Sequence, residues 1–417
     1  MSRDIHRLVD AVWRIESARI VATLAKVTGD VGLAEDLAQE ALVEALEQWP
    51  RAGVPRNPGA WLTAVAKRRA IDAWRRRDAL DERYRAIAHD LDETTDAAWE
   101  PIDDDVLRLV FTACHPVLSR ESQVALTLRV VSGLTTEEIA RMLLVPVATV
   151  QARITRAKKT LAAAHVPFET PEPAEWPARL AGVLGVVYLL FTEGYAATSG
   201  DRWIREDLAR EALRLGRVLA GLVPREPEAH ALVALMEFQA SRFAARVASD
   251  GSPVLLADQD RARWDRAQIA RGVEALKRAD AAARGRGSYA LQAAIAQCHA
   301  VAPSVEETDW EQIVILYEAL GRAAPSPVVE LNRAVAVSVA TGPATALRIV
   351  DALADEPAFR GSHLLPSVRG ELLAQLGRTE EARSELLTAA GLTANEREAA
   401  VLRKKAAALS PTQSGAP

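Results

Sequence analysis

Residues 121–163, ESQVALTLRVVSGLTTEEIARMLLVPVATVQARITRAKKTLAA, have the pattern of a helix-turn-helix whose last helix is basic and amphipathic. In that last helix Val150, Ile154, Ala157 and Leu161 recur at helical spacing and predict a buried stripe. The prediction leaves the polar and small residues facing outward, and these are Gln151, Ala152, Arg153, Thr155, Arg156, Lys158 and Lys159.

The charge of this segment indicates what the outward face could contact. Between Ile139 and Thr160 the sequence has five Lys or Arg residues and no Asp or Glu. This is the sign of charge that neutralises phosphates, and an α-helix fits the major groove of B-DNA. A basic helix face that is only solvated has the same composition, and this alternative stays open.

Length and composition bound the fold. A chain of 417 residues exceeds the usual size of a single core, so we expect two or three domains. Ala, Leu, Arg and Glu dominate and strand-like alternation is scarce, which predicts an all-α fold. The two cysteines, Cys114 and Cys298, lie far apart without metal-ligand spacing, as expected for buried thiols in a reducing cytoplasm.

We expect a cytoplasmic protein that does not bind a membrane. The sequence has no recognisable signal peptide, and its longest apolar stretch, Leu180–Phe191, is too short to span a bilayer. No phosphate-binding glycine loop or metal-ligand cluster stands out, and His115, His299 and His363 are isolated. We therefore expect no enzymatic activity, no metal and no cofactor.

Charge is distributed unevenly along the chain. Lys and Arg outnumber Asp and Glu by 13 to 10 in residues 1–77 and by 8 to 3 in residues 106–165, whereas residues 78–105 have 2 basic and 11 acidic residues. The predicted organisation is a module at 1–77, an acidic linker at 78–105, a helix-turn-helix module at 106–165, a Pro-rich linker at 166–177, a helical extension at 178–409 and a disordered tail at 410–417.

A second basic helix is predicted from about Ala60 to Arg77, in the first module. It has six basic residues against one acid, Asp72, and an apolar face that includes Trp61 and Trp74. The basic residues could follow a DNA backbone, while the tryptophans either belong to the core or stack on an opened base. The preceding helix, 33–49, is expected to stop at Pro50.

Three segments in this order resemble bacterial extracytoplasmic-function sigma factors of RNA polymerase: AEDLAQEALVEALEQW (34–49), WLTAVAKRRAIDAWRRR (61–77) and the helix-turn-helix at 121–163. The resemblance implies that the first segment binds core polymerase through Asp36, Gln39 and Glu40. It implies contacts to the −10 promoter element by Asn57, Trp61, Arg68, Arg69, Asp72, Arg75 and Arg76. It implies contacts to the −35 element by Thr149, Gln151, Arg153, Thr155, Arg156 and Lys158.

The acidic linker at 78–105 has two interpretations. It is either a solvated tether or a segment that threads a basic channel of the polymerase, as the resemblance implies for sigma linkers.

The extension beyond residue 165 contains two similar units, one beginning at Ser326 and the other at His363. Gly342 and Gly377 stand at equivalent positions in them, and the spacing resembles tetratricopeptide repeats, which predicts stacked helical hairpins. The extension, together with phrases such as SYALQAAIAQCHA (288–300), resembles that of sigma factors in which a C-terminal helical domain is thought to replace a separate anti-sigma factor.

Two further segments of the extension, 186–201 and 255–272, concentrate aromatic and charged residues. They form either a contact site for a protein or small ligand, or ordinary core residues and helix caps. The residues concerned are Tyr188, Glu193, Tyr195, Asp258, Asp260, Arg261, Trp264 and Asp265.

We therefore expect an RNA polymerase sigma factor that binds core polymerase and promoter DNA and is regulated in cis by its C-terminal helical domain. The alternative is a stand-alone helix-turn-helix regulator or a repeat-type adaptor that does not bind core polymerase.

Overall fold

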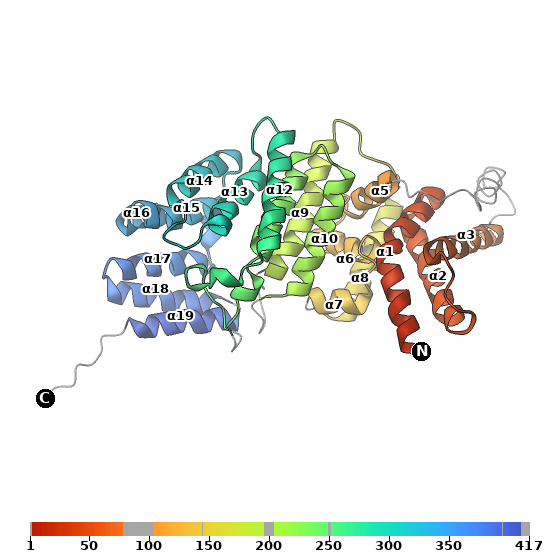
Figure 1. Ribbon diagram of the computed structural model, residues 1–417, viewed down its shortest axis with the longest axis horizontal. Helices are drawn as coiled ribbons and strands as arrows, with labels where there is room; N and C mark the ends of the chain where they lie inside the picture. Colours follow the sequence, from red (N-terminus) through yellow and green to blue (C-terminus); the bar gives the residue numbers. More distant parts are fainter. Residues whose placement is uncertain are drawn as a thin grey trace. The chain divides into compact units, whose positions relative to one another are not determined.

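The computed structural model describes residues 2–77, 103–143, 145–195, 204–248, 252–393 and 395–409. The chain divides into two compact units, residues 1–187 and 188–417, and both are built from helices (Figure 1). Extended backbone pairs at an isolated bridge between Val247 and Pro253. The prediction of an all-α fold is confirmed.

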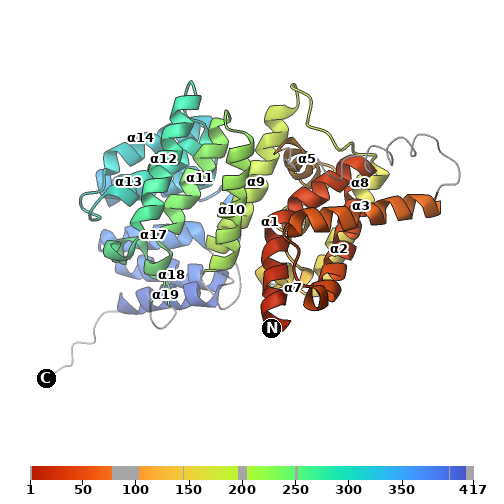
Figure 2. The ribbon, with the colours of Figure 1, turned by 45° about the vertical axis from the view of Figure 1, so that its right-hand side comes forward.

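The first unit contains two helical modules. The N-terminal module is formed by three mutually packed helices, and the helix-turn-helix module by the four that follow (Figure 2). The helices are α1 (Ser2–Thr28), α2 (Val31–Ala52), α3 (Pro58–Arg77), α5 (Asp103–Ala113), α6 (Arg120–Val130), α7 (Thr136–Leu143), α8 (Val147–Ala163) and the greater part of α9 (Trp176–Tyr195).

Helix α2 shows how local sequence sets its boundaries. The Asp30 side chain accepts hydrogen bonds from the backbone N–H groups of Gly32 and Leu33, at 2.7 and 3.1 Å, and so caps the helix. The prediction that the helix stops at Pro50 is wrong, because the helix continues to Ala52. A proline in the last turn removes one backbone hydrogen bond but leaves the preceding turns intact, and Gly53, at φ +85°, then ends the helix.

Helices α6, α7 and α8 form the predicted helix-turn-helix. The stripe of Val150, Ile154, Ala157 and Leu161 is buried, as predicted. Pro146 precedes α8 without a side-chain cap, and its extended conformation directs the chain into the first turn.

The acidic linker was predicted to extend to residue 105, but helix α5 already begins at Asp103. Negative charge is favourable in the first turn of a helix, which accounts for the earlier start. Asp105 is buried and pairs with Lys26 and Arg108, at 3.3 and 2.6 Å. The rest of the linker and the tail at 410–417 lie outside the described residues.

Helix α9 is longer than its apolar stretch suggested. It spans 20 residues and is, by length and composition alone, apolar enough to cross a membrane. Leu184, Val187 and Phe191 are nevertheless buried inside the protein.

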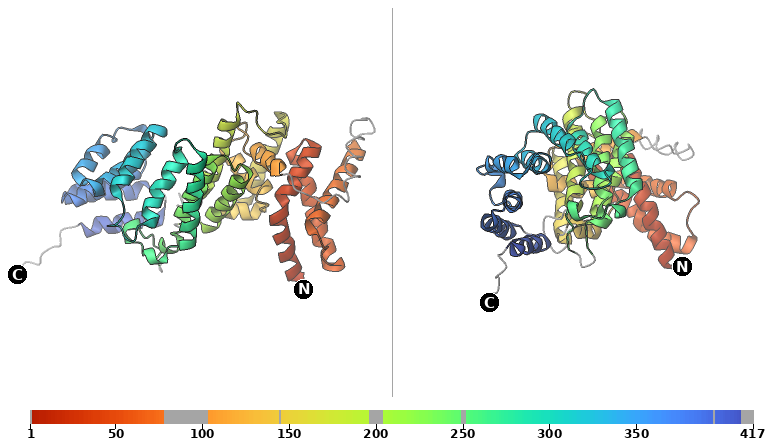
Figure 3. Two further views of the ribbon diagram at one scale, coloured as in Figure 1. Left: turned by 45° about the horizontal axis from the view of Figure 1, so that its top comes forward. Right: turned by 60° about the vertical axis from the view of Figure 1, so that its left-hand side comes forward.

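The second unit continues as antiparallel helices and ends in neighbouring hairpins, drawn in blue in Figure 3. Gly342 and Gly377 lie at inter-helix turns with φ of +117° and +73°, as their equivalent sequence positions predicted. The elements are α10 (Glu206–Leu222), α11 (Pro227–Ala240), η1 (Phe243–Ala245), η2 (Leu256–Asp258), η3 (Arg261–Arg263), α12 (Arg266–Ala282), α13 (Ser288–Val301), α14 (Trp310–Ala323), α15 (Pro327–Ala340), α16 (Pro343–Asp351), η4 (Pro357–Phe359), α17 (Leu364–Gln375), α18 (Thr379–Leu392) and α19 (Glu396–Ala408).

Candidate nucleic-acid and protein interface

The outward face of α8 carries several of the residues predicted to contact DNA. Gln151, Thr155 and Arg156 are exposed, whereas Thr149 and Arg153 are partly buried. A shallow hollow lies along this face because several of its side chains are short. Its lining is Gln151, Ala152, Thr155, Arg156, Lys159, Thr160, Ala163 and Ala164. Cations beside open space on one helix face are the arrangement that admits a phosphate backbone or a base edge.

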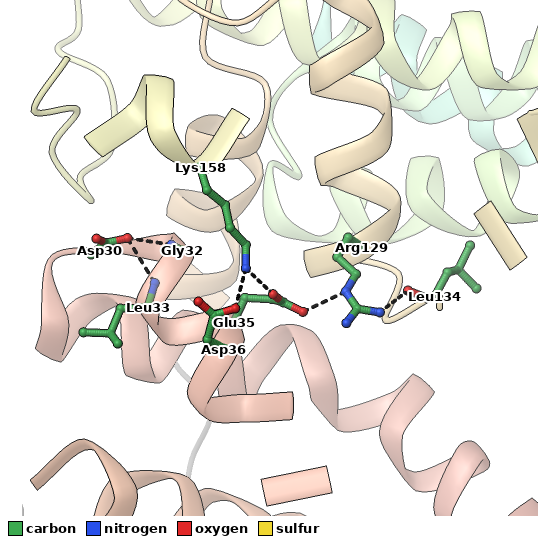
Figure 4. Close-up of polar contacts among 8 residues, drawn as sticks. All are labelled: Asp30, Gly32, Leu33, Glu35, Asp36, Arg129, Leu134 and Lys158. Carbon is green, nitrogen blue, oxygen red and sulfur yellow. Dashed lines mark hydrogen bonds and ion pairs between the residues drawn. The ribbon is translucent and has the colours of Figure 1, made fainter. Parts of the chain in front are cut away.

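Lys158, predicted to contact DNA, instead points toward α2 (Figure 4). Its ammonium group donates to the carboxylates of Glu35 and Asp36, and the distance to Asp36 Oδ1 is 2.7 Å. Arg129 Nε donates to the other oxygen of Glu35 at 2.7 Å and Arg129 Nη1 to the carbonyl of Leu134 at 3.1 Å. We call Glu35, Asp36, Arg129 and Lys158 the Glu35 cluster.

Glu35 is the buried centre of this cluster. Its side chain is only 4% exposed, against 66% for Asp36, so the ion pairs of Glu35 are screened little by solvent. Burial lowers the pKa of Lys158, but the charges and hydrogen bonds of Glu35 and Asp36 outweigh this and hold that pKa above its usual value. Lys158 is therefore charged and engaged in this structure.

Other contacts also join the two modules of the first unit. Arg14 on α1 pairs with Glu138 on α7, and Lys26 pairs with Asp105. Gly133, in the turn after α6, has φ of +66°, and a Cβ there would meet the Ser17 hydroxyl oxygen at 2.3 Å. The modules therefore pack closely against each other, and Gly133 permits that approach.

The predicted polymerase-binding residues lie along α2. Asp36 and Glu40 are exposed and Gln39 is partly exposed. Glu40 accepts from Arg69 Nη1 at 3.2 Å, and Glu44 accepts from Arg69 Nη2 at 2.8 Å. The hydrogen bond to Glu44 is the largest cause of the raised pKa of Arg69. Two residues predicted for different partners, Glu40 and Arg69, thus pair with each other.

The remaining residues predicted for the −10 element belong to α3 and its start. Asn57 Oδ1 accepts from the backbone N–H of Ala60 at 3.1 Å, so Asn57 acts as a helix cap. Trp61 is partly exposed and packs edge-on against Trp49 with ring centroids 5.5 Å apart. Arg68 is exposed. The side chains of Asp72, Arg75 and Arg76 lie outside the described residues.

Sequence reasoning missed Glu35 and Arg129. A usable signal was present, since Glu35 lies beside the apolar positions Val31, Ala34 and Ala38 of an amphipathic helix. An acid beside an apolar stripe implies a buried partner, but the partner cations come from residues 129 and 158 and could not be assigned from the sequence.

The acidic residues singled out in the second unit have mainly structural positions. Asp260 caps η3 and Asp265 caps α12, with side chains accepting from the N–H groups of Ala262 and Gln268. Asp258 is exposed at the end of η2, and Glu193 pairs with Arg205. The interpretation as helix caps therefore holds for Asp260 and Asp265.

Aromatic residues of the same segments contact arginine side chains. The Arg246 guanidinium lies 3.5 Å from the ring centroid of Tyr195, and the Arg261 guanidinium lies 4.8 Å from that of Trp264. Burial lowers the pKa of Arg246 to about 10. Tyr188 lies beside a cavity of the same unit.

Three family models match the chain, in an order that agrees with the two modules and the extension. Residues 14–80 match Sigma-70 region 2 and residues 108–161 match Sigma-70, region 4. Residues 179–280 match a family of unknown function, DUF6596.

Similar proteins extend this assignment. An uncharacterized protein of Rhizobium meliloti (strain 1021) is 45% identical over 411 residues, which cover 95% of this chain and 96% of that protein. The probable ECF RNA polymerase sigma factor SigI of Mycobacterium tuberculosis (strain ATCC 25618 / H37Rv) is 28% identical over 176 residues, which cover 41% of this chain and 59% of that protein.

No solved structure matches the chain. Both sigma-70 regions are nevertheless present in order, and they correspond to the two modules joined at the Glu35 cluster. The chain belongs to the extracytoplasmic-function group of the sigma-70 family of RNA polymerase sigma factors, with a DUF6596 segment in its C-terminal extension.

Proposed function

We propose that this sigma factor docks on core polymerase through α2, contacts the −10 element with α3 and the −35 element with α8, and is controlled in cis by its C-terminal helical unit. Under this proposal it acts in the cytoplasm, without a membrane and without catalysis of its own. The observation that carries the proposal is the Glu35 cluster, in which Asp36, assigned to polymerase, and Lys158, assigned to DNA, neutralise each other.

The cluster links the two binding events in this proposal. A carboxylate that pairs with Lys158 is not available to a basic surface of polymerase, and a lysine that pairs with Glu35 is not available to phosphate. Binding of core polymerase to α2 therefore competes with the contact between modules, and separating the modules exposes Lys158 for DNA. The exposed residues Gln151 and Arg156 are available for DNA in either arrangement.

Start-site mapping tests the assignment of α2. Purified chain, core polymerase and a library of promoters are combined, and transcripts are compared for the unmodified chain and the Gln39→Ala, Glu40→Lys variant. The proposal expects specific transcripts from the unmodified chain and loss of core binding in the variant. Glu47→Lys, an exposed reversal elsewhere on α2, serves as the control. Equal core binding by both variants would reject the assignment.

The proposed control in cis is tested with a truncated chain that lacks the second unit but keeps the contacts of the first. Trp176 packs against Phe111 with ring centroids 5.0 Å apart, and Arg179 Nη2 donates to the Phe111 carbonyl at 3.2 Å. A truncation ending near residue 165 would remove both contacts, so we choose a chain ending at Val187. Retention of its helical circular dichroism is checked first. Unchanged promoter choice and transcript yield relative to the full chain would reject control in cis.

A further inference from the structure

The second unit contains a cavity of about 430 Å³ between α9, α11, α13, α14 and α15. Its wall combines polar groups with apolar and aromatic side chains, among them Phe238, Ile295 and Leu320 beside the rings of Tyr188 and Tyr317. Binding sites for small molecules have volumes of about 300–1,000 Å³. The cavity is therefore large enough for a compact organic molecule.

One cation, Arg242, stands among the described residues that line this cavity, and none of the described carboxylates forms an ion pair with it. Its guanidinium donates to Tyr195 Oη and Gln239 Oε1, which are both neutral groups. Among the described residues no carboxylate is within ion-pair distance of Arg242, and the cavity lining contains neither Asp nor Glu. Arg242 is partly exposed, and a carboxylate that entered the cavity would meet a guanidinium that pairs with no described acid.

A second arginine, Arg261, lies near Arg242. Arg261 donates to the carbonyls of His299 and Ala302, both at 2.7 Å, and thereby fixes the end of α13 beside the cavity. Together with Arg242 it adds positive charge around the polar end of the cavity. The surroundings favour an anion over a cation or a neutral molecule.

His299 also lines the cavity. Its Nδ1 is buried and has no hydrogen-bond partner in the described part of the protein. Burial, followed by the positive charges of Arg242 and Arg261, lowers the pKa of His299 to about 4, so the ring is neutral near pH 7.

We propose that this cavity binds a small organic monocarboxylate, with its carboxylate at Arg242 and its apolar body among Phe238, Leu320 and Tyr188. A single charge is favoured because only one cation lines the cavity, whereas a phosphate dianion generally needs more. Five helices surround the space, which fits a small molecule rather than an extended chain. This binding does not depend on the proposed control of transcription.

The first test compares acids with their neutral counterparts on the full chain. The probes are 3-phenylpropionate and indole-3-acetate, and the controls are 3-phenylpropionamide and indole-3-acetamide, which have nearly the same shape without the charge. Affinity is measured by saturation-transfer NMR and calorimetry. We expect at least one acid to bind about tenfold or more tightly than its amide, as expected for a charge-assisted hydrogen bond. Equal binding of acids and amides, or no acid binding at about 10 mM, would overturn the proposal.

The second test assigns the binding to this cavity. Asn332 lies exposed at its edge on α15, so Asn332→Glu adds a negative charge without disturbing the core, and Asn332→Gln is the matched neutral control. We expect Asn332→Glu to weaken acid binding severalfold and Asn332→Gln to leave it unchanged. Arg242→Gln should abolish the preference for acid over amide, provided that its thermal unfolding shows a folded chain.

A separate basic hollow in the same unit provides the negative control. It is lined by Arg217, Arg225, Arg278 and His230, and Arg225 is exposed there. Arg225→Gln should leave acid binding unchanged. Loss of binding in Arg225→Gln, with binding retained in Asn332→Glu, would assign the acid to that other hollow and overturn the proposal.

Discussion

The two units of this sigma factor treat partly buried charge differently. In the Glu35 cluster two carboxylates face two cations, and the polar atoms of the central Glu35 are all used within the protein. In the cavity of the second unit Arg242 donates to two neutral groups and pairs with none of the described carboxylates, and His299 Nδ1 has no partner in that part of the protein. In the Glu35 cluster the opposite charges stabilise one arrangement of the chain itself. In the cavity the positive charge of Arg242 favours binding of an added anion.

Removing the central carboxylate of the Glu35 cluster should have the largest effect on stability. Glu35→Ala leaves Arg129 and Lys158 without their buried counter-ion, which should lower the free energy of unfolding of the first unit by about 3–5 kcal/mol. Urea unfolding followed by tryptophan fluorescence measures this. Glu47→Ala, on the exposed face of α2, should change it by less than about 0.5 kcal/mol. Similar values for the two variants would show that the cluster is not stabilising.

Protonation of His299 should have an effect almost as large in the other unit. The folded chain lowers its pKa from 6.5 to about 4, so below pH 6.5 the unfolded chain binds a proton that the folded chain resists. The contribution of His299 to stability is thus fully present above pH 6.5 and is lost as pH falls to about 4, a loss of about 3 kcal/mol.

Unfolding of the full chain at pH 7.5, 6, 5 and 4 measures this dependence, with His299→Asn as the comparison. The variant should be less stable at pH 7.5 but lose less stability on acidification. A saturating carboxylate in the cavity should reduce the acid sensitivity of the unmodified chain, because the anion stabilises the protonated ring. Identical pH profiles for the variant and the unmodified chain would contradict the assignment.

Two glycines allow the contact between modules to be separated from backbone strain. Gly29 and Gly133 both have φ of +66°, but a Cβ at Gly29 has nothing within 4 Å, whereas one at Gly133 would meet Ser17. Gly29→Ala should therefore cost about 1 kcal/mol from backbone conformation alone. Gly133→Ala should cost about 2 kcal/mol, because Ser17 must also move. Equal losses in thermal unfolding would show that close packing of the modules does not matter at this point.

The local features of the fold could be predicted from the sequence, but its long-range pairs could not. Helical periodicity identified the buried stripe of α8, and the equivalent glycines Gly342 and Gly377 identified two inter-helix turns. The prediction that Lys158 faces outward is wrong, because its side chain pairs with the carboxylate of Glu35, which lies 123 residues earlier in the chain. The unbalanced charge of Arg242 was missed for the same reason, since the cavity is assembled from five separate helices.

The smallest expected effect concerns the exposed pair of the Glu35 cluster, Asp36 and Lys158, and the affinity for core polymerase. Asp36 is 66% exposed, so its pair with Lys158 is worth at most about 1 kcal/mol, and freeing Asp36 should raise affinity for core polymerase by no more than about fivefold. Lys158→Met should show this increase, because core polymerase no longer competes with the lysine. Lys159→Met, at the neighbouring exposed position, should leave the affinity for core polymerase unchanged. It should instead lower the affinity for promoter DNA and make that affinity less dependent on salt concentration. If Lys158→Met weakens core binding as well, the contact between modules assists polymerase rather than competing with it, and the cluster would be part of the docking surface.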